Sequence, residues 1–308
     1  MKKLLISFLS LSFILSSACH SKLYTRQSIN RQIADDRGNK NLIGLCNKKA
    51  LEKKPYSVWF NKNYANYQID TVTAEKLKPG LAGKQITLFM GTWCGDSRRE
   101  IPRIFKILDY CGVSENRIKL VMLSREDSTY KQSPTHEEKG LNIHRVPDLI
   151  VYDNGQEMGR IVESPIISLE KDLLSILSKE PYSPNYRGVS FLVDLFRNKS
   201  ISEIRPEDSG YVNKLHTLVK NSSELNTYGY VLMAAKEMEK AGLVFRFNTV
   251  LFPGDANVFD SMGEYYLRTG NKNDAKQNYL KTLQLEPSNE DAKQKLAEIG
   301  IGEKAGKY

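Results

Sequence analysis

Residues 85–97 read QITLFMGTWCGDS, a short apolar run that ends in a glycine and leads to a tryptophan and a cysteine. Such a run is typical of a buried central strand. Apolar residues between positions 101 and 108 then recur at i, i+3, i+4 and i+7, the spacing of one helix face. Gly112 predicts the end of that helix. This stretch therefore predicts a strand, a tight connection bearing Cys94, and a long helix.

The sequence on the C-terminal side continues the alternation of strands and helices. Residues 118–123 (IKLVML) predict a second strand, and residues 146–162 predict a hairpin around an Asn-Gly turn. Ser168 is a helix N-cap in front of the amphipathic residues 169–177. These elements predict an α/β domain over residues 56–180.

The position of Cys94 at the start of the predicted helix affects the chemistry expected of its thiol. Unpaired backbone N–H groups and the helix dipole at this position favour a thiolate, the nucleophilic form of cysteine. Trp93 is expected to cover one side of the sulfur, and Gly95 to allow the sharp entry into the helix. The negative charge of Asp96 interacts favourably with the helix dipole, yet it partly offsets the stabilisation of a neighbouring thiolate.

The segment Trp93-Cys94-Gly95-Asp96-Ser97 resembles the active-site segment of the thioredoxin family. Pro102 has the spacing of the proline that kinks this helix in thioredoxins. Val146-Pro147, at the start of a strand, resembles the family's cis-proline loop. The resemblance implies a central mixed sheet flanked by helices and a cis peptide bond at Pro147. It also implies that the backbone beside Pro147 lies against the reactive sulfur.

Two residues depart from the thioredoxin pattern. Ser97 replaces the second cysteine, which in that family breaks the mixed disulfide formed by the first. The Ser97 hydroxyl can still hydrogen-bond to a thiolate at Cys94. Leu88 occupies the position, six residues before the first cysteine, where thioredoxins usually bury an acid. We therefore expect a nucleophile and a binding groove without an internal resolving step.

The remaining cysteines do not replace the missing thiol. Cys111 is 17 residues along the same helix from Cys94, or roughly 25 Å, too far for a disulfide. Cys46 and Cys111 either form one disulfide or are both free, and the second alternative is preferred.

Two histidines, His136 and His144, lie between the second predicted strand and the proline loop. His144 either approaches Cys94 or, as we prefer, is an ordinary loop histidine with a hydrogen bond. No residue pattern indicates a metal site, a phosphate loop or a Ser-His-Asp arrangement, so we expect neither metal nor cofactor.

Residues 1–18 have the pattern of an export signal: two lysines, a dozen mostly apolar residues, then small residues before Cys19. The small residues resemble a bacterial lipobox, which predicts lipid attachment at Cys19 and a membrane-anchored protein of the cell envelope. Alternatively, cleavage releases a secreted protein, or the segment is retained as an anchor. Residues 19–55 are polar and basic, and are predicted to form a tether.

The formal charge of the chain is +9, from 45 basic and 36 acidic residues. The basic residues are scattered through predicted helices instead of forming a stripe, and no nucleic-acid-binding module is present. We therefore expect no nucleic-acid partner.

The C-terminal part repeats itself after a predicted linker over residues 181–207. The pattern LxxYGxxL at residues 225–232 recurs 34 residues later as FxxMGxxY at residues 259–266. This period resembles the tetratricopeptide repeat. We therefore predict all-α helical repeats over residues 208–300, followed by a tail over residues 301–308.

Two functions fit these patterns. In the first, Cys94 carries out thiol–disulfide exchange or isomerisation on exported proteins, with a substrate thiol or an external reductant releasing the adduct. In the second, the protein is a redox-inactive adaptor that binds client or envelope proteins through its groove and helical repeats.

Overall fold

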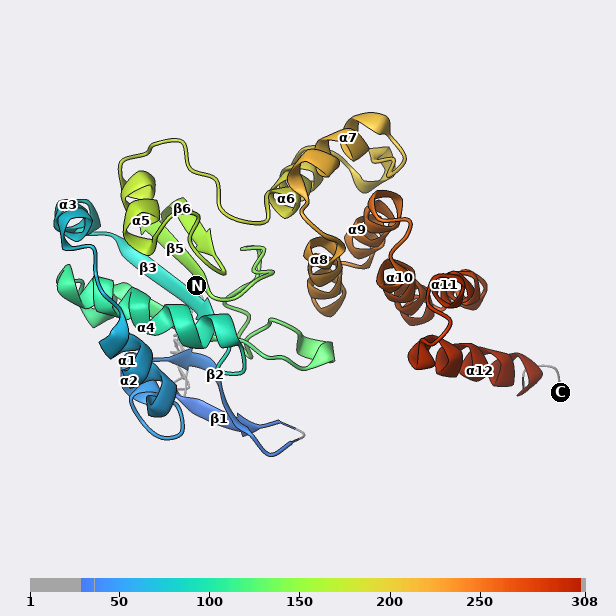
Figure 1. Ribbon diagram of the computed structural model, residues 1–308, viewed down its shortest axis with the longest axis horizontal. Helices are drawn as coiled ribbons and strands as arrows, with labels where there is room; N and C mark the ends of the chain where they lie inside the picture. Colours follow the sequence, from blue (N-terminus) through green and yellow to red (C-terminus); the bar gives the residue numbers. More distant parts are fainter. Residues whose placement is uncertain (1–28, 36, 306–308) are drawn as a thin grey trace, which may run out of the picture.

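The computed structural model describes residues 29–35 and 37–305. The expected signal peptide over residues 1–18 and the lipid acceptor Cys19 lie outside the described residues. An α/β half is followed by a helical half, and the two lie side by side (Figure 1). The prediction of an α/β domain followed by an all-α domain is confirmed at this level.

The α/β half contains a six-stranded mixed sheet with the order β1-β2-β4-β3-β5-β6. Its strands are β1 (Arg31–Ala34), β2 (Lys40–Cys46), β3 (Gln85–Met90), β4 (Ile118–Met122), β5 (Asp148–Asp153) and β6 (Gln156–Val162). Strands β3 and β4 are parallel, and the other neighbouring pairs are antiparallel. The predicted central strand and the predicted hairpin around the Asn-Gly turn are confirmed.

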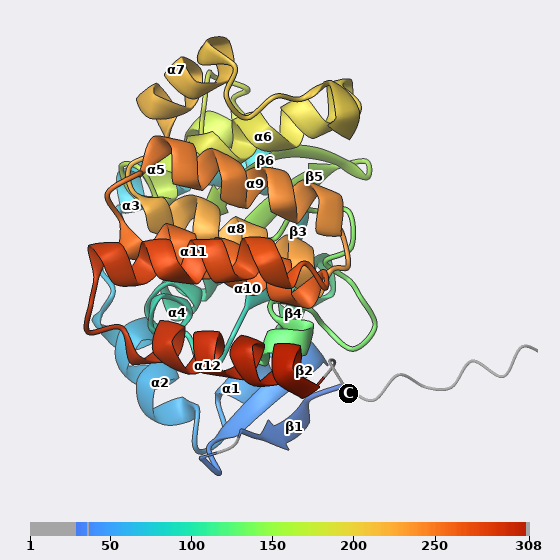
Figure 2. The same ribbon diagram turned by 90° about the vertical axis from the view of Figure 1, so that its right-hand side faces the viewer.

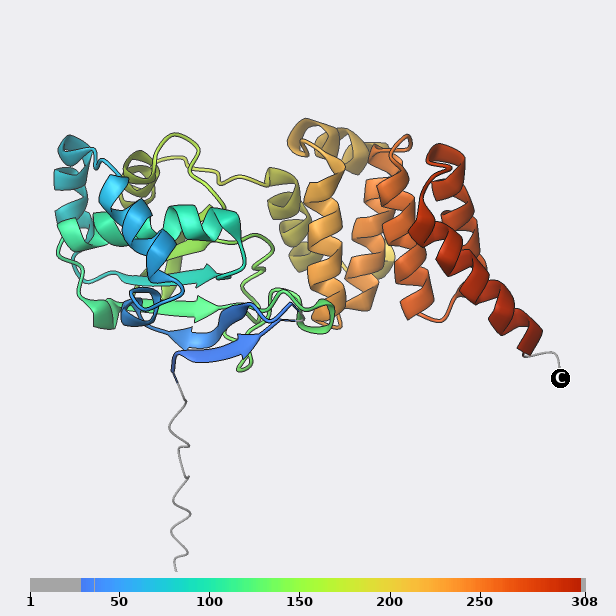
Figure 3. The same ribbon diagram turned by 60° about the horizontal axis from the view of Figure 1, so that its bottom comes forward.

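Alternation along the strands divides the core into two parts. On β3, Ile86 and Leu88 belong to the large apolar cluster that the helices cover, whereas Phe89 belongs to a smaller cluster on the other face. The covering helices are α1 (Lys48–Leu51), α2 (Ser57–Asn66), α3 (Thr71–Leu81), α4 (Gly95–Tyr110) and α5 (Leu169–Leu177). Figure 3 shows α2 and α4 together on one side of the strands. The smaller cluster is completed by Ile143 and Val146, from the long connection between β4 and β5.

The ends of two helices follow the predicted signals. Gly112 has φ +70° just after α4, so it adopts the left-handed conformation that favours glycine. The backbone N–H of Val113 then donates to the carbonyl of Leu108 at 2.9 Å. The Ser168 hydroxyl accepts from the backbone N–H of Lys171 and caps α5.

The predicted tether over residues 19–55 is wrong for the part that the structure describes. β2 pairs with β4 inside the sheet, with Cys46 opposite Leu120. Leu42 and Leu51 are buried in the main core. The strand is short: its buried apolar residues Leu42, Ile43 and Cys46 follow the mostly exposed β1 and precede the polar residues 47–49.

The helical half is a series of paired helices (Figure 2). They are α6 (Arg187–Asn198), α7 (Ser209–Leu218), α8 (Ser222–Ala234), α9 (Met238–Leu251), α10 (Ala256–Arg268), α11 (Lys272–Leu285) and α12 (Glu290–Ala305). In two of the pairs, α8–α9 and α10–α11, a glycine allows close approach: a Cβ added at Gly229 would lie 2.6 Å from the Phe245 ring, and one at Gly263 would lie 3.0 Å from the Tyr279 ring. These contacts occur at equivalent places of the 34-residue period.

The predicted linker and tail are shorter in the structure. α6 occupies residues 187–198 of the linker expected over 181–207, because its apolar face packs in the core of the helical half through Val189 and Leu192. Helix α12 likewise continues to Ala305, four residues beyond the predicted start of the tail. Three 3₁₀ turns complete the description, at Glu115–Arg117, Asp127–Thr129 and Ile201–Glu203.

Candidate functional site

Cys94 lies at the junction between β3 and α4. It is the N-cap residue of α4, with φ −87° and ψ 126°, and its backbone N–H donates to the carbonyl of Gly91 at 3.0 Å. The carbonyl of Cys94 accepts from the Arg98 N–H and closes the first turn of the helix. The sulfur is therefore at the positive end of a long helix and partly exposed.

Trp93 closes one side of this junction. Its indole N–H donates to the carbonyl of Leu123 at 2.9 Å. The ring lies over Gly91, where an added Cβ would be 2.3 Å from the indole. Any larger residue at position 91 would displace the tryptophan, which explains why a glycine ends the strand.

Residues from the N-terminal hairpin hold the loop between β3 and Cys94. The Thr92 hydroxyl accepts from the backbone N–H of Leu42 at 3.1 Å and donates to the Asn41 side chain at 3.0 Å. The guanidinium of Arg98 donates to the carbonyl of Thr92 at 2.6 Å. The segment expected to be a tether is thus part of the support for Cys94.

The predicted cis peptide bond at Val146-Pro147 is confirmed. It brings the Val146 carbonyl to the sulfur, and the Cys94 thiol donates to this oxygen at 3.3 Å. Val146 is buried beneath the sulfur in the smaller core cluster. The expectation that the backbone beside Pro147 contacts the thiol is therefore confirmed.

Ser97 and Gly95 do not have their expected roles. Ser97 is fully buried, and its hydroxyl accepts from the backbone N–H of Gly91 at 3.4 Å. Within the described part of the chain it forms no hydrogen bond with Cys94, because it faces the loop behind the sulfur. Gly95 needs no special backbone angle and has open space where a Cβ would be, so the helix entry does not require glycine there.

The other supporting residues of α4 are placed as the sequence suggested. Asp96 is in the first turn and pairs with Arg99 at 2.8 Å, which compensates its charge beside the sulfur. Pro102 is buried within the helix. Leu88 is fully buried in the core, so no acid is present at that position.

Cys46, Cys94 and Cys111 are all free thiols. Burial raises the pKa of Cys46 to about 12. Cys111 is at the opposite end of α4 from Cys94 and donates to the Ala74 carbonyl at 3.5 Å. The preferred alternative of two unpaired cysteines is confirmed, and neither is near enough to resolve an adduct on Cys94.

Sequence reasoning missed Lys131, which follows the short 3₁₀ turn after β4. Its side chain is 4% exposed, and its Nζ atom is 5.2 Å from the centre of the Trp93 ring. Burial lowers the pKa of Lys131 to about 8, and the neighbouring Cys94 opposes that shift. A single lysine in a polar loop gives no periodic signal, so only the folded chain reveals its burial.

The histidines lie apart from the sulfur. The buried ring of His144 packs edge-on against Tyr186 and Tyr228 at the junction of the two halves, and Nδ1 is 3.1 Å from the Asn142 carbonyl. Burial lowers the pKa of His144 to about 3, so it is neutral near pH 7. The preferred structural role of His144 is confirmed, and His136 is an exposed loop residue 3.1 Å from Glu138.

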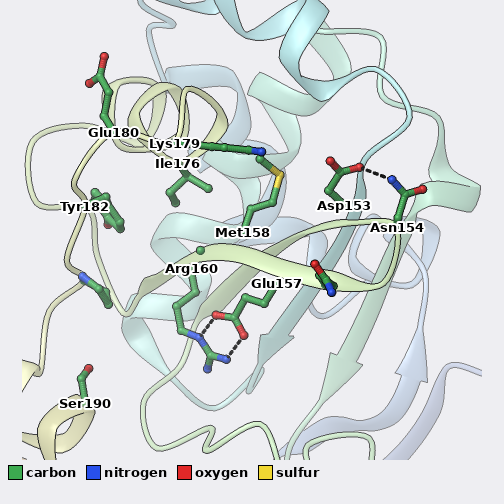
Figure 4. Close-up of a pocket in the computed structure, with 13 residues that line it drawn as sticks. Asp153, Asn154, Glu157, Met158, Arg160, Ile176, Lys179, Glu180, Tyr182 and Ser190 are labelled. Atoms are coloured by element: carbon green, nitrogen blue, oxygen red, sulfur yellow. Dashed lines mark hydrogen bonds and ion pairs between the residues drawn. The ribbon is translucent and has the colours of Figure 1, made fainter. Parts of the chain in front are cut away.

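A separate cavity of about 640 Å³ lies between β6, the end of α5 and the segment leading to α6. Figure 4 shows Arg160 and Glu157 joined by two bonds on one wall, with Lys179 and Tyr182 on another. None of its lining residues is a cysteine, so it offers no thiol chemistry.

Residues 29–35 and 37–305 contain no cluster of His, Cys, Asp or Glu side chains that could hold a metal ion. Across the same residues, no helix is both long and apolar enough to cross a membrane.

Comparison with known proteins leaves the site to be judged on its own geometry. No protein-family model matches the chain, and a search of curated proteins gave no significant match.

Proposed function

We propose that the protein is a thioredoxin-like, single-thiol protein that exchanges or isomerises disulfides of exported proteins. It would be anchored to a bacterial membrane in the cell envelope through a lipidated Cys19. The observation that carries the proposal is the position of the Cys94 sulfur, at the start of α4 and 3.3 Å from the carbonyl that precedes cis-Pro147. The paired helices that follow would be tetratricopeptide-like repeats and a second surface for protein partners.

The chemistry follows from one available thiol. The Cys94 thiolate attacks one sulfur of a substrate disulfide, a mixed disulfide forms, and the other substrate sulfur leaves as a thiolate. Ser97 cannot complete the reaction, and Cys46 and Cys111 are elsewhere in the fold. The adduct is therefore released by a second thiol of the substrate, which isomerises it, or by a low-molecular-weight thiol.

Replacing Cys94 tests the proposal directly. We expect Cys94→Ser to abolish exchange with a model disulfide peptide and to abolish mixed disulfides trapped with envelope proteins. Cys111→Ser is the matched control and should retain both. A Cys94→Ser protein that still exchanges disulfides would refute the proposal.

Adding a resolving thiol tests whether the missing second cysteine limits release of the adduct. Ser97→Cys restores a cysteine three residues after Cys94, so the intermediate acquires an internal exit. We expect turnover of the model disulfide in the presence of a limiting thiol to rise about tenfold. No increase would mean that release of the adduct is not limiting.

One observation supports the alternative of a redox-inactive adaptor. A cavity of about 380 Å³ lies between α8, α10 and the loop after β4, and Tyr130 and Asp127 line it beside Tyr230 and Asn257. A polypeptide bound there would contact both halves of the molecule. Partner capture that survives Cys94→Ala, without any mixed disulfide, would favour this function.

The proposed anchor has its own test. Mass spectrometry of the mature N-terminus should find an acylated Cys19, and an unmodified terminus at Cys19 or His20 would reject the lipid attachment.

A further inference from the structure

The connection between β4 and β5, which carries cis-Pro147, packs against the helical half. Helices α6 and α8 are the parts of the helical half nearest to the α/β half (Figure 1). The ring of His144 packs edge-on against Tyr186, at the start of α6, and against Tyr228, on α8. The residues that lead into the cis-proline are therefore held from the helical side.

Arg145 joins this connection to α8 by a direct hydrogen bond. Its Nη2 atom donates to the carbonyl of Ser223, in the first turn of α8, at 2.9 Å. Its Cζ atom lies 4.8 Å from the centre of the Tyr186 ring, which is a cation–π contact. One guanidinium group thus contacts the starts of two helices.

Glu163 reaches the same place from the residue directly after β6. Its carboxylate lies 3.5 Å from Nη1 of Arg145 and accepts a hydrogen bond from the Tyr186 hydroxyl. Its backbone N–H donates to the carbonyl of Pro147 at 2.7 Å. We call Arg145, Glu163 and Tyr186 the junction cluster. It connects the helical half to the residues on both sides of Val146.

Val146 carries the acceptor that faces the reactive sulfur. Its carbonyl accepts from the Cys94 thiol at 3.3 Å. A residue has only two soft backbone dihedrals, so fixing both of its neighbours leaves it little freedom. Because the junction cluster holds Arg145 and Pro147, it also sets the position of this carbonyl relative to Cys94.

The shielding of the junction cluster makes its ion pair more effective than one on the open surface. The side chains of Arg145 and Glu163 are 19% and 23% exposed. In the pair between Arg197 and Asp194 on α6, the two side chains are 68% and 65% exposed. Such an exposed pair contributes little to stability. Arg197 is therefore a suitable control for Arg145.

The anchor of Arg145 also borders a place where a polypeptide can bind. Ser223 lines the cavity of about 380 Å³ that Tyr130 and Asp127 share with α8 and α10. A chain that occupies this cavity touches the residue whose carbonyl holds Arg145. The cavity and the cis-proline loop are thus joined through a single residue.

We propose that Arg145 is a positioning residue through which the helical half holds the cis-proline loop against Cys94, and that the substrates are polypeptide disulfides bound across the two halves. This inference rests on the proposed exchange function and deepens it. An incoming disulfide must align with the Cys94 sulfur beside the Val146 carbonyl. A misplacement of about 1 Å can cost on the order of a hundredfold in rate. The helical half is then part of the thiol site.

Two substitutions weaken the junction cluster to different degrees. Arg145→Met removes the hydrogen bond, the ion pair and the cation–π contact, and keeps an unbranched side chain. Arg145→Lys keeps a positive charge for Glu163 but lacks the planar group that contacts Ser223 and Tyr186 together. Arg197→Met is the matched control, because it removes an exposed arginine of the helical half.

The first measurement compares exchange with a disulfide-bonded peptide and alkylation of Cys94 by iodoacetamide. We expect Arg145→Met to raise KM for the peptide about tenfold, and Arg145→Lys to raise it less. The alkylation rate and the circular dichroism spectrum should stay close to those of the native protein, since alkylation requires no alignment with the loop. Arg197→Met should keep the native KM. A native KM in Arg145→Met would overturn the role of Arg145, and Arg145→Lys replaces it in this comparison if Arg145→Met does not fold.

The second measurement tests the anchoring without any activity. The Glu163 amide donates to the Pro147 carbonyl, so its protection from amide hydrogen exchange reports how firmly the loop is held. We expect this protection to fall about tenfold in Arg145→Met and to persist in Arg197→Met. Unchanged protection in Arg145→Met would overturn the anchoring. A native protein with Arg145-dependent protection that exchanges no disulfide would overturn the proposed function and leave the anchoring in place.

Discussion

The two ends of α4 carry the same side chain in opposite surroundings. Cys94 is the N-cap residue, next to free N–H groups, and Cys111 is the C-cap residue, next to free carbonyls. The Cys94 thiol donates to the carbonyl of Val146, and the ring of the preceding Trp93 faces the buried Lys131. Burial raises the pKa of Cys111, an effect that Lys78 only partly opposes. The comparison shows that the fold gives the same residue type two different environments.

The largest expected effect is a direct comparison of the two thiols. At pH 7 we expect Cys94 to be alkylated on the order of a thousandfold faster than Cys111, because Cys94 lies at the N-terminus of the helix whereas burial raises the pKa of Cys111. Peptide-resolved mass spectrometry after short exposure to iodoacetamide measures both in one sample. Similar rates would remove the distinction between the two ends.

The buried Lys131 predicts that stability rises with pH at the Cys94 end of α4. Its pKa is about 8 in the fold and about 10.4 in an unfolded chain, so between these values the unfolded chain binds more protons. Stability should therefore rise with pH through this window, by up to about 3 kcal/mol. Below about pH 8, the free-energy cost of burying the charged lysine is present in full.

Urea unfolding from pH 7 to 10.5 measures this effect, comparing Cys94→Ser with the double variant that also carries Lys131→Met. The Cys94→Ser background removes the thiol from the titration. Parallel stability curves for the two proteins would show that Lys131 is not desolvated as the structure describes.

The smallest expected effects are losses of stability from substitutions near the two ends of α4. Thr92→Val leaves the Leu42 N–H and the Asn41 side chain without their partner, which should cost about 2 kcal/mol. Gly112→Ala meets no neighbouring atom and should cost about 1 kcal/mol through its left-handed backbone alone. Thermal unfolding gives both values. Only Thr92→Val should also change the alkylation rate of Cys94, so a change in Gly112→Ala would mean that the ends are coupled.

Local sequence signals predicted the centre of the α/β half well. The run at residues 85–90, the helix-ending Gly112 and the Asn-Gly turn each specify structure through their own residues or close neighbours. The cis bond before Pro147, and the contact of the neighbouring backbone with Cys94, were predicted from the family resemblance. In the helical half, the 34-residue period, which aligns Gly229 with Gly263, predicted the paired helices.

The errors share one physical cause, which is that long-range contacts leave little trace in local composition. β2 is a strand because β4 is available to pair with it, and α6 is a helix buried against the rest of the helical half. The burial of Lys131 and the supports of Thr92 likewise arise from contacts between distant segments. A single sequence shows these residues as polar and isolated, so their place beside Cys94 could not be predicted.

The pairing of β2 with β4 also bears on the order in which the chain assembles. The β1–β2 hairpin can form from local contacts, but Cys46 reaches Leu120 only by closing a loop of about 75 residues. Such non-local pairing is slow compared with helix formation. Because Asn41 and Leu42 hold Thr92, the loop that carries Cys94 becomes complete only when this closure takes place. A partly folded chain would therefore have α4 and its cysteine before it has the site.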